Sequence, residues 1–303
     1  MVEHNMTMAK LLSKLRYKSR STKKRYDLLE SPTKEVTTPE VDLHMGGIIN
    51  FFSTMSQTEI LEYCLGFDKQ GAPKLAEHII LVALKYRTLD DEPYPLLEVG
   101  LHFIHRCDAK NELDNPGPHS LNILRQISYR HMIMEDNAHH ANRLPDPREI
   151  EINHFGATRF VSVGDAKDIL EQIFRTPPAI YSPTGRKSYL ACPCPIVMLN
   201  YDTPQWPALE KAFEIDPFIA YNIVATINTK CIACEPGNPW SSDTITLSKL
   251  TQELKIEYPA QQSASDQAAY AIIDAIQLVM RPKVPLAIES IRSVYVESIA
   301  TAG

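Results

Sequence analysis

Glycine is scarce in this sequence, with 11 in 303 residues. A nucleotide cradle lined by backbone amides needs several glycines close together. The patterns G-x-x-x-x-G-K-[ST] and G-x-G-x-x-G for phosphate binding, and G-x-S-x-G for a nucleophilic serine, are all absent. The spacing of Asp and Glu singles out no pair of carboxylates. The sequence therefore carries no catalytic signature, and we expect a protein that is not an enzyme.

Long apolar runs are also missing. The longest run covers residues 79–84, far short of the roughly eighteen residues that a membrane-spanning helix needs. Lys10 and Lys14 interrupt the apolar residues near the N-terminus, so there is no secretory signal core. Val at position 2 excludes the myristoylation pattern, and the last three residues carry no prenylation signal. We expect an intracellular location, in the cytoplasm or the nucleus.

What the sequence does have is an uneven charge. Its 31 basic and 37 acidic side chains give a formal net charge of −6, but residues 1–25 hold eight basic side chains and a single acid, Glu3. The basic residues are Lys10, Lys14, Arg16, Lys18, Arg20, Lys23, Lys24 and Arg25. A basic arm on an acidic body indicates a partner that carries phosphate.

The arm has three readings. Residues 6–17 suit a short helix with Leu11, Leu12 and Leu15 on one side and lysines opposite, which is typical of a helix at a membrane interface. Each Lys or Arg contributes about 1 kcal/mol near an anionic membrane surface. The same charges would bind RNA through its phosphates, with strong salt dependence. A nuclear-localisation stretch or a solvated tail is the third reading.

The body reads as an α+β fold with a predominantly helical N-terminal half and a mixed strand and helix C-terminal half. We divide the chain into a basic arm and linker (1–45), a helical region (46–142) and a mixed α/β region (143–303). In the helical region, Ser56 and Glu59 predict a capping box. Further helices are expected over 75–86, 96–107 and 120–136.

The mixed α/β region contains segments with the apolar spacing of strands and segments with the apolar spacing of helices. Strands are expected over residues 157–163, 196–200 and 218–229, and helices over 165–174, 247–254 and 265–280. The apolar spacing of residues 284–299 suits neither state well.

Four of the six cysteines form two close pairs, Cys192-Pro-Cys194 and Cys231-Ile-Ala-Cys234. Four thiolates spaced as C-x-C and C-x-x-C can complete a tetrahedral zinc site. The alternative is that they are small buried apolar residues. Zinc is thus a candidate cofactor.

A short peptide, Tyr94-Pro95-Leu96-Leu97, matches the pattern Y-P-x-L. Enveloped-virus structural proteins use this peptide to recruit the host membrane-scission machinery. Proline favours an extended conformation that presents Tyr94 and Leu97 to a groove. Leu96 and Leu97 can equally begin the next helix.

The basic, leucine-containing head (mostly residues 8–25), the linker, the Y-P-x-L peptide and the α+β body together resemble the layout of rhabdovirus-type matrix proteins. The resemblance implies a non-enzymatic viral structural protein in the virion. Such a protein would be a peripheral membrane protein that bridges an anionic membrane to nucleocapsid or RNA and self-associates into a homo-oligomer. The alternative is an intracellular RNA-binding viral factor with a zinc-stabilised second half.

Overall fold

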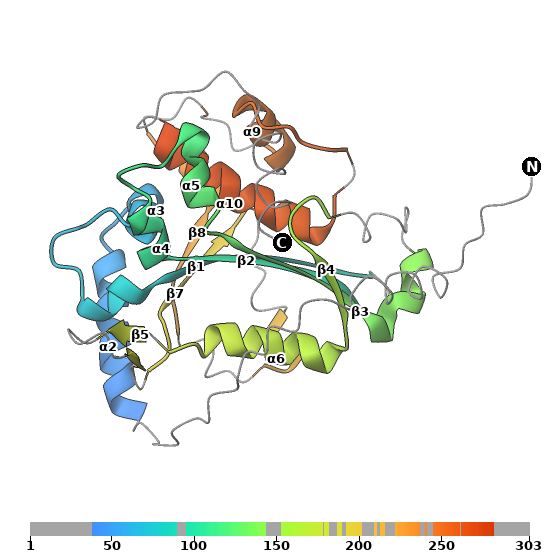
Figure 1. Ribbon diagram of the computed structural model, residues 1–303, viewed down its shortest axis with the longest axis horizontal. Coiled ribbons are helices and arrows are strands. Elements are labelled where there is room, and N and C mark those ends of the chain that lie inside the picture. The colour runs from blue at the N-terminus through green and yellow to red at the C-terminus, as the bar shows by residue number, and fades with distance from the viewer. Residues whose placement is uncertain are drawn as a thin grey trace, which may run out of the picture. The chain divides into compact units, whose positions relative to one another are not determined.

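A six-stranded mixed sheet runs through the computed structural model, with the strand order β4-β3-β2-β1-β7-β8 (Figure 1). The structure describes residues 38–89, 95–143, 153–177, 179–181, 187–189, 192–201, 209–210, 213–215, 222–236, 240, 245–260 and 262–281. The strands of the sheet are β1 (Ile80–Thr88), β2 (Leu96–His105), β3 (Ser128–Met134), β4 (Thr158–Val161), β7 (Ile196–Asn200) and β8 (Ile223–Asn228). A separate two-stranded sheet pairs β5 (Ala179–Tyr181) with β6 (Lys187–Tyr189).

Strand β1 pairs with one antiparallel and one parallel neighbour. On one side it pairs antiparallel with β2, which pairs antiparallel with β3. On the other side it pairs parallel with β7, which pairs parallel with β8. At the far edge, β4 pairs parallel with β3. The chain therefore builds the sheet outward from β1 in two opposite directions.

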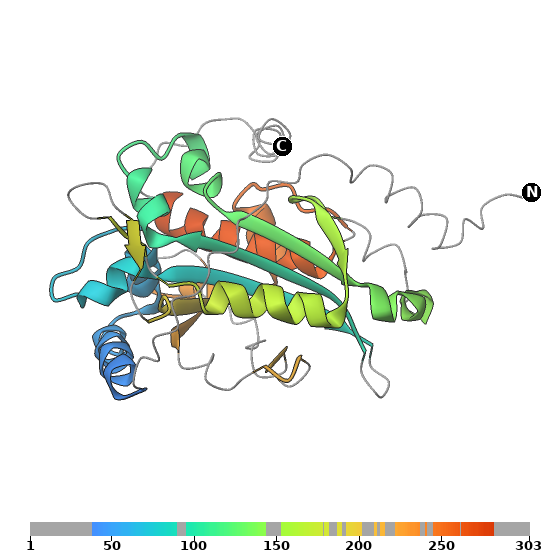
Figure 2. The same ribbon diagram turned by 60° about the horizontal axis from the view of Figure 1, so that its bottom comes forward.

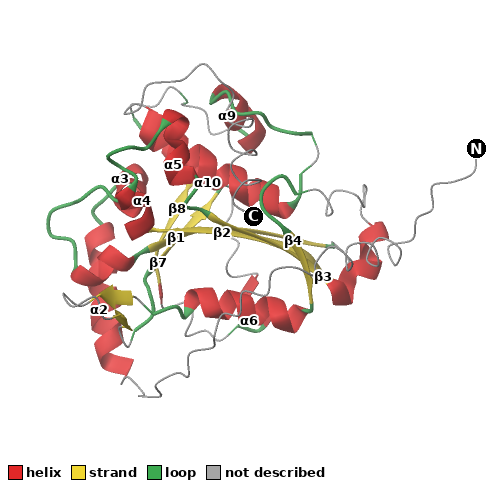
Figure 3. Cartoon of the chain, viewed as in Figure 1, coloured by secondary structure: helices red, strands yellow, loops and turns green. Residues whose placement is uncertain are grey.

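Helices cover both faces of the sheet (Figures 2 and 3). One face packs against α6 (Val163–Phe174), and the other packs against the long helix α10 (Ala264–Met280). The other α-helices are α2 (Thr38–Phe52), α3 (Gln57–Cys64), α4 (Arg106–Asn111), α5 (Leu121–Leu124), α8 (Thr229–Ala233) and α9 (Leu247–Glu253), and short 3-10 helices span Lys74–His78, Pro118–Ser120 and Glu135–Arg143. None of the helices in the described ranges is long and apolar enough to cross a bilayer.

The α+β class expected from the sequence is confirmed. The capping box of Ser56 and Glu59 begins α3, because Ser56 accepts the Glu59 N–H and Glu59 accepts the Ser56 N–H. The expected strand 196–200 is β7, and the helices expected over 165–174, 247–254 and 265–280 are α6, α9 and α10. The segment 284–299 lies outside the described residues.

The helices expected over 75–86 and 96–107 are wrong, because these segments form most of β1 and β2. The segment 120–136 contains only the short α5 before it becomes β3. In β1, apolar side chains from Ile80 to Leu84 are buried continuously, since helices cover both faces of the sheet. A strand buried on both faces loses the polar alternation that identifies strands in a sequence. The sheet also draws strands from both 46–142 and 143–303.

Candidate functional site

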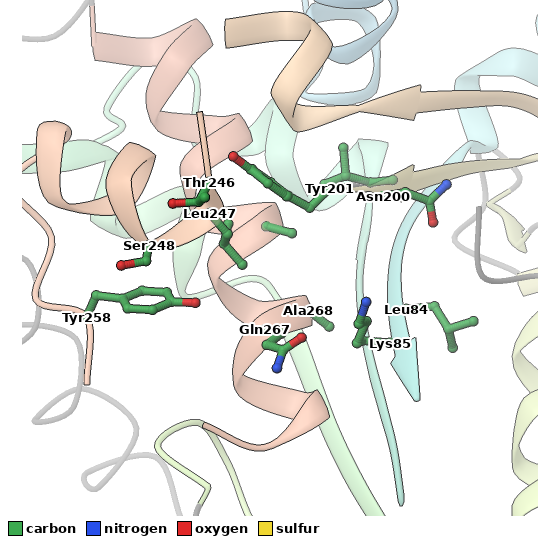
Figure 4. Close-up of a pocket in the computed structure, with 12 residues that line it drawn as sticks. Leu84, Lys85, Asn200, Tyr201, Thr246, Leu247, Ser248, Tyr258, Gln267 and Ala268 are labelled. Atoms are coloured by element: carbon green, nitrogen blue, oxygen red, sulfur yellow. The ribbon is translucent and has the colours of Figure 1, made fainter. Parts of the chain in front are cut away.

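A pocket of about 270 Å³ lies at the carboxyl end of β7, beside the middle of β1 (Figure 4). Its walls come from β1, from the end of β7, from α9 and its flanking residues, and from α10. The lining residues are Leu84, Lys85, Leu199, Asn200, Tyr201, Thr246, Leu247, Ser248, Tyr258, Gln267, Ala268 and Ala271. In open α/β sheets, ligands bind beyond the carboxyl ends of the strands where the strand order reverses. The junction of β1 and β7 is such a place.

The two strands contribute side chains to the pocket by alternation. Leu84 packs in the core beneath α6, so the next residue, Lys85, points to the opposite face, toward α10. The parallel register places Tyr201 beside Lys85 and Asn200 beside Leu84. Figure 4 shows Lys85 and Tyr201 on the α10 side and Leu84 and Asn200 directed away from it. The Tyr201 hydroxyl donates to the carbonyl of Ile245 at 2.8 Å, which ties β7 to the start of α9.

The opposite wall contains Ser248 and Tyr258 (Figure 4). Thr246 fixes the start of α9, because its hydroxyl accepts the Lys249 N–H at 3.2 Å. The Tyr258 ring packs against Tyr270 of α10, with the ring centroids 4.9 Å apart. Burial raises the pKa of Tyr258, so its hydroxyl stays protonated at neutral pH.

Helix α10 is held at its first turn by Asp266, which is fully buried. Ser263 caps the helix by accepting the Asp266 N–H at 3.0 Å, and the Asp266 carboxylate accepts the Ser263 N–H in return. The same carboxylate accepts the backbone N–H of His154 at 2.8 Å and lies 2.9 Å from the Nδ1 of His154. Donors from the protein thus surround Asp266.

Glu98 of β2 ties the sheet to the same helix end and is also fully buried. Its Oε1 accepts the Ala264 N–H at 2.8 Å and lies 3.0 Å from the Nε of Arg87. Its Oε2 lies 2.9 Å from the Nε2 of His131. Arg87 also donates to the carbonyl of Gln262 at 2.9 Å. The side chains of Glu98 and Arg87 therefore hold the residues just before and at the start of α10.

His102 lies four residues after Glu98 in β2, on the same face of the sheet, and its imidazole is neutral. Its Nε2 lies 2.8 Å from the carbonyl of Ser265, and its Nδ1 accepts the Arg130 N–H at 3.3 Å. A carbonyl cannot donate, so the proton of the ring is on Nε2. Burial lowers the pKa of His102 to about 3, which agrees with this neutral form.

Asp274 lies two turns along α10 from Gln267 and is fully buried. Its Oδ2 is 2.6 Å from the hydroxyl of Thr251, and that hydroxyl also lies 2.8 Å from the carbonyl of Leu247. The Thr251 hydroxyl can donate its one proton to either of these two acceptors. Burial raises the pKa of Asp274 well above its usual range, in keeping with a neutral carboxylic acid.

The residues singled out from the sequence lie elsewhere. The basic arm, Lys10 to Arg25 with Leu11, Leu12 and Leu15, and Tyr94 of the Y-P-x-L peptide are outside the described residues. Leu97 of that peptide is buried in β2, with 1% of its surface exposed. A leucine inside the sheet cannot be presented to the groove of a partner.

The structure does not bring the four paired cysteines together. Cys192 and Cys194 precede the start of β7, whereas Cys231 and Cys234 follow the end of β8. Because β7 and β8 are parallel neighbours, the two pairs lie at opposite ends of these strands. Cys194 is buried in the core beneath α6, and burial raises its pKa to about 12, which opposes the thiolate that zinc requires.

The sequence analysis missed the pocket residues, because they carry no local motif. Lys85, Tyr201, Ser248, Tyr258 and Gln267 are scattered over more than 180 positions and meet only through the fold. The nearest available signal was the apolar run 79–84 followed by Lys85, a pattern consistent with a buried strand that carries one charged residue.

The sheet order and the position of the pocket define an open α/β domain with a pocket where the strand order reverses. Residues 80–278 match the family described as DNA polymerase III subunit epsilon-like, C-terminal domain, or DEDDh_C. The match covers more than half of the 303 residues, so the chain belongs to this family. No curated protein matches the chain. Every residue that lines the pocket falls inside the matched segment.

This membership corrects the expectations drawn from the basic arm. The resemblance to rhabdovirus matrix proteins is wrong, and it depended on residues 8–25, whereas the family match begins at residue 80. A DEDDh exonuclease-like domain indicates a nucleic-acid-processing enzyme. The expectations of a non-enzymatic viral structural protein and of a zinc-stabilised RNA-binding viral factor are therefore both wrong. The substrate class indicated is nucleic acid, in place of membrane, nucleocapsid and host scission machinery.

Exonucleases of the DEDDh type use divalent metal ions. Such ions are held by carboxylates and other oxygen ligands. The described residues contain no group of three or more His, Cys, Asp or Glu side chains placed to hold a metal, and no residue that lines the pocket is acidic. The buried acids Glu98, Asp266 and Asp274 are all bound within the protein. The part of the pocket that the structure describes therefore does not fit a divalent metal centre.

Proposed function

We propose that this chain processes nucleic acid and that the end of a strand enters the pocket between β1, β7, α9 and α10. The observation that carries this proposal is the family match over residues 80–278, which contains the whole of the described pocket lining. The position of the pocket, at the switch point of an open sheet, supports it independently.

The chemistry of the lining suits a polar ligand with a planar part. Lys85, Ser248 and Gln267 offer an ammonium, a hydroxyl and an amide, and Tyr258 offers an aromatic ring. Phosphates bind to cations and hydroxyls, and unpaired bases stack on aromatic rings. A strand end carries both groups.

The overall charge favours a local site over a broad binding face. The formal net charge of −6 opposes a polyanion as a whole. Binding across a duplex usually depends on many basic side chains along one surface. A pocket that holds only the end of a strand needs far fewer.

The test uses the full chain with end-labelled single-stranded and double-stranded DNA and RNA, with Mg²⁺ or Mn²⁺ present. Both retention and shortening of the label are measured. The variant Ser248→Trp fills the pocket, and Ser53→Trp makes the same change at an exposed site beyond α2. We expect one of the four substrates to be bound or shortened by the wild type and by Ser53→Trp, but not by Ser248→Trp. If the wild type neither retains nor shortens any of them, the proposal is overturned.

A further inference from the structure

Lys85 is placed differently from Arg87, the next residue on the same face of β1. Arg87 pairs with Glu98. Lys85, two residues before Arg87 on the same face of β1, has no acidic partner among the described residues and lines the pocket. Its side chain is half-buried between β1 and α10 (Figure 4).

An ammonium group in this position determines which charge the pocket accepts. The groups that share the lining with it are neutral, since they are hydroxyls, amides and apolar side chains. None of the described lining residues is a carboxylate, so the ammonium repels a divalent cation and attracts an anion, and partial burial strengthens both effects.

The size of the pocket limits the ligand. About 270 Å³ is slightly below the roughly 300–1,000 Å³ of sites for drug-sized ligands. This volume suits one nucleotide and excludes a base pair. Tyr258 and Gln267 border the same space as Lys85, so a base can stack and hydrogen-bond while its phosphate meets the ammonium.

We infer that the pocket binds the terminal nucleotide of a single strand through its phosphate and Lys85, without a divalent metal ion. This inference rests on the proposed function, because it names the part of the nucleic acid that the same pocket holds. It goes beyond that proposal because it predicts that the strand end still binds when EDTA has removed divalent metal ions.

The test is fluorescence anisotropy of the full chain with a labelled ten-nucleotide single strand, in EDTA and in Mg²⁺, over a range of salt concentrations. We expect the wild type to bind in both buffers with similar affinity. The variant Lys85→Gln should bind about tenfold more weakly or worse in EDTA, as expected for loss of a charge-assisted hydrogen bond. Its salt slope should fall by about 0.7, the share of one phosphate on a single strand.

Two further variants provide the controls. Lys85→Arg keeps the charge and should restore most of the binding, and Lys74→Gln removes a lysine from the turn before β1 and should change nothing. Wild-type binding that disappears in EDTA, or a Lys85→Gln variant that binds like the wild type, overturns the inference and leaves the proposed function standing. Absence of wild-type binding and shortening in both buffers overturns both.

Discussion

Gly100 of β2 lies directly against Ser265 in the first turn of α10. A Cβ atom built on Gly100 would come within 2.2 Å of the Ser265 Cα and 2.6 Å of its backbone nitrogen. The obstacle is backbone, which cannot rotate away as a side chain can. Only glycine permits this approach, and the approach sets the height of α10 above the sheet and so the depth of the pocket beside Gln267.

We predict that Gly100→Ala destabilises the protein by about 3 kcal/mol, at the upper end of the usual cost of overpacking a core. Gly47→Ala is the matched control, because Gly47 lies in α2 with nothing within 4 Å of the added Cβ. That change should stabilise by about 0.5–1 kcal/mol. Urea unfolding of both variants measures the difference. Equal effects would show that β2 and α10 do not touch in this way.

We predict that removing the buried Glu98 carboxylate also destabilises the protein, because its partners lose a charged acceptor. Glu98→Ala removes the carboxylate that pairs with half-buried Arg87 and with buried His131, and we expect a loss of about 3–5 kcal/mol. Glu253→Ala, at an exposed position of α9, should stay within about 0.5 kcal/mol of the wild type. Denaturant unfolding at neutral pH measures the stability of both variants. A Glu98→Ala variant as stable as Glu253→Ala would show that the contacts of Glu98 with Arg87 and His131 do not stabilise the protein.

We predict that the contribution of Asp274 to the free energy of unfolding falls as the pH rises. Its pKa is raised in the folded state, so folding takes up a proton once the pH exceeds about 3.9, the ordinary value for Asp. Relative to Asp274→Asn, the free energy of unfolding of the wild type should fall by about 1.4 kcal/mol per pH unit above that value, until the folded-state pKa is reached. The Asn side chain does not ionise and still offers an oxygen to the Thr251 hydroxyl, so the variant lacks this slope. Parallel stability curves from pH 4 to pH 8 would mean that Asp274 is ionised in the folded protein.

Tyr258 should contribute to ligand binding through its ring. Stacking of a base on an aromatic side chain is worth about 1–3 kcal/mol, so we expect Tyr258→Ala to weaken single-strand binding about 5- to 150-fold. Tyr258→Phe keeps the ring and its packing on Tyr270 and should bind nearly as well as the wild type. Anisotropy titrations on variants with unchanged melting temperature test this, and equal affinities of the Ala and Phe variants would exclude stacking at this site.

The sequence was sufficient for elements whose patterns are local. The run at 196–200 was bounded by prolines and polar residues and is β7, and the capping signal at Ser56 corresponds to the start of α3. It was insufficient for β1 and β2, where burial on both faces removes the alternation. In β2, Glu98 and His102 face α10, and their polarity reflects the anchoring of a helix end rather than exposure to solvent.

The site itself could not be predicted, for a topological reason. Lys85 and Tyr201 become neighbours only because β7 returns parallel to β1 after more than 90 intervening residues. The basic arm, in contrast, is a strong local signal, and it directed the sequence analysis to residues 8–25. The family match covers residues 80–278 and does not include the basic arm.

The central claim is that nucleic acid enters the pocket on α10. Photo-crosslinking tests it most directly: a single strand with a photoreactive terminal nucleotide is irradiated with the full chain, and the modified residues are mapped by mass spectrometry. Our account predicts crosslinks to the pocket lining, foremost Tyr258 and Lys85, that disappear when unlabelled strand competes. Crosslinks confined to residues 1–25, or spread evenly over the surface, would contradict it.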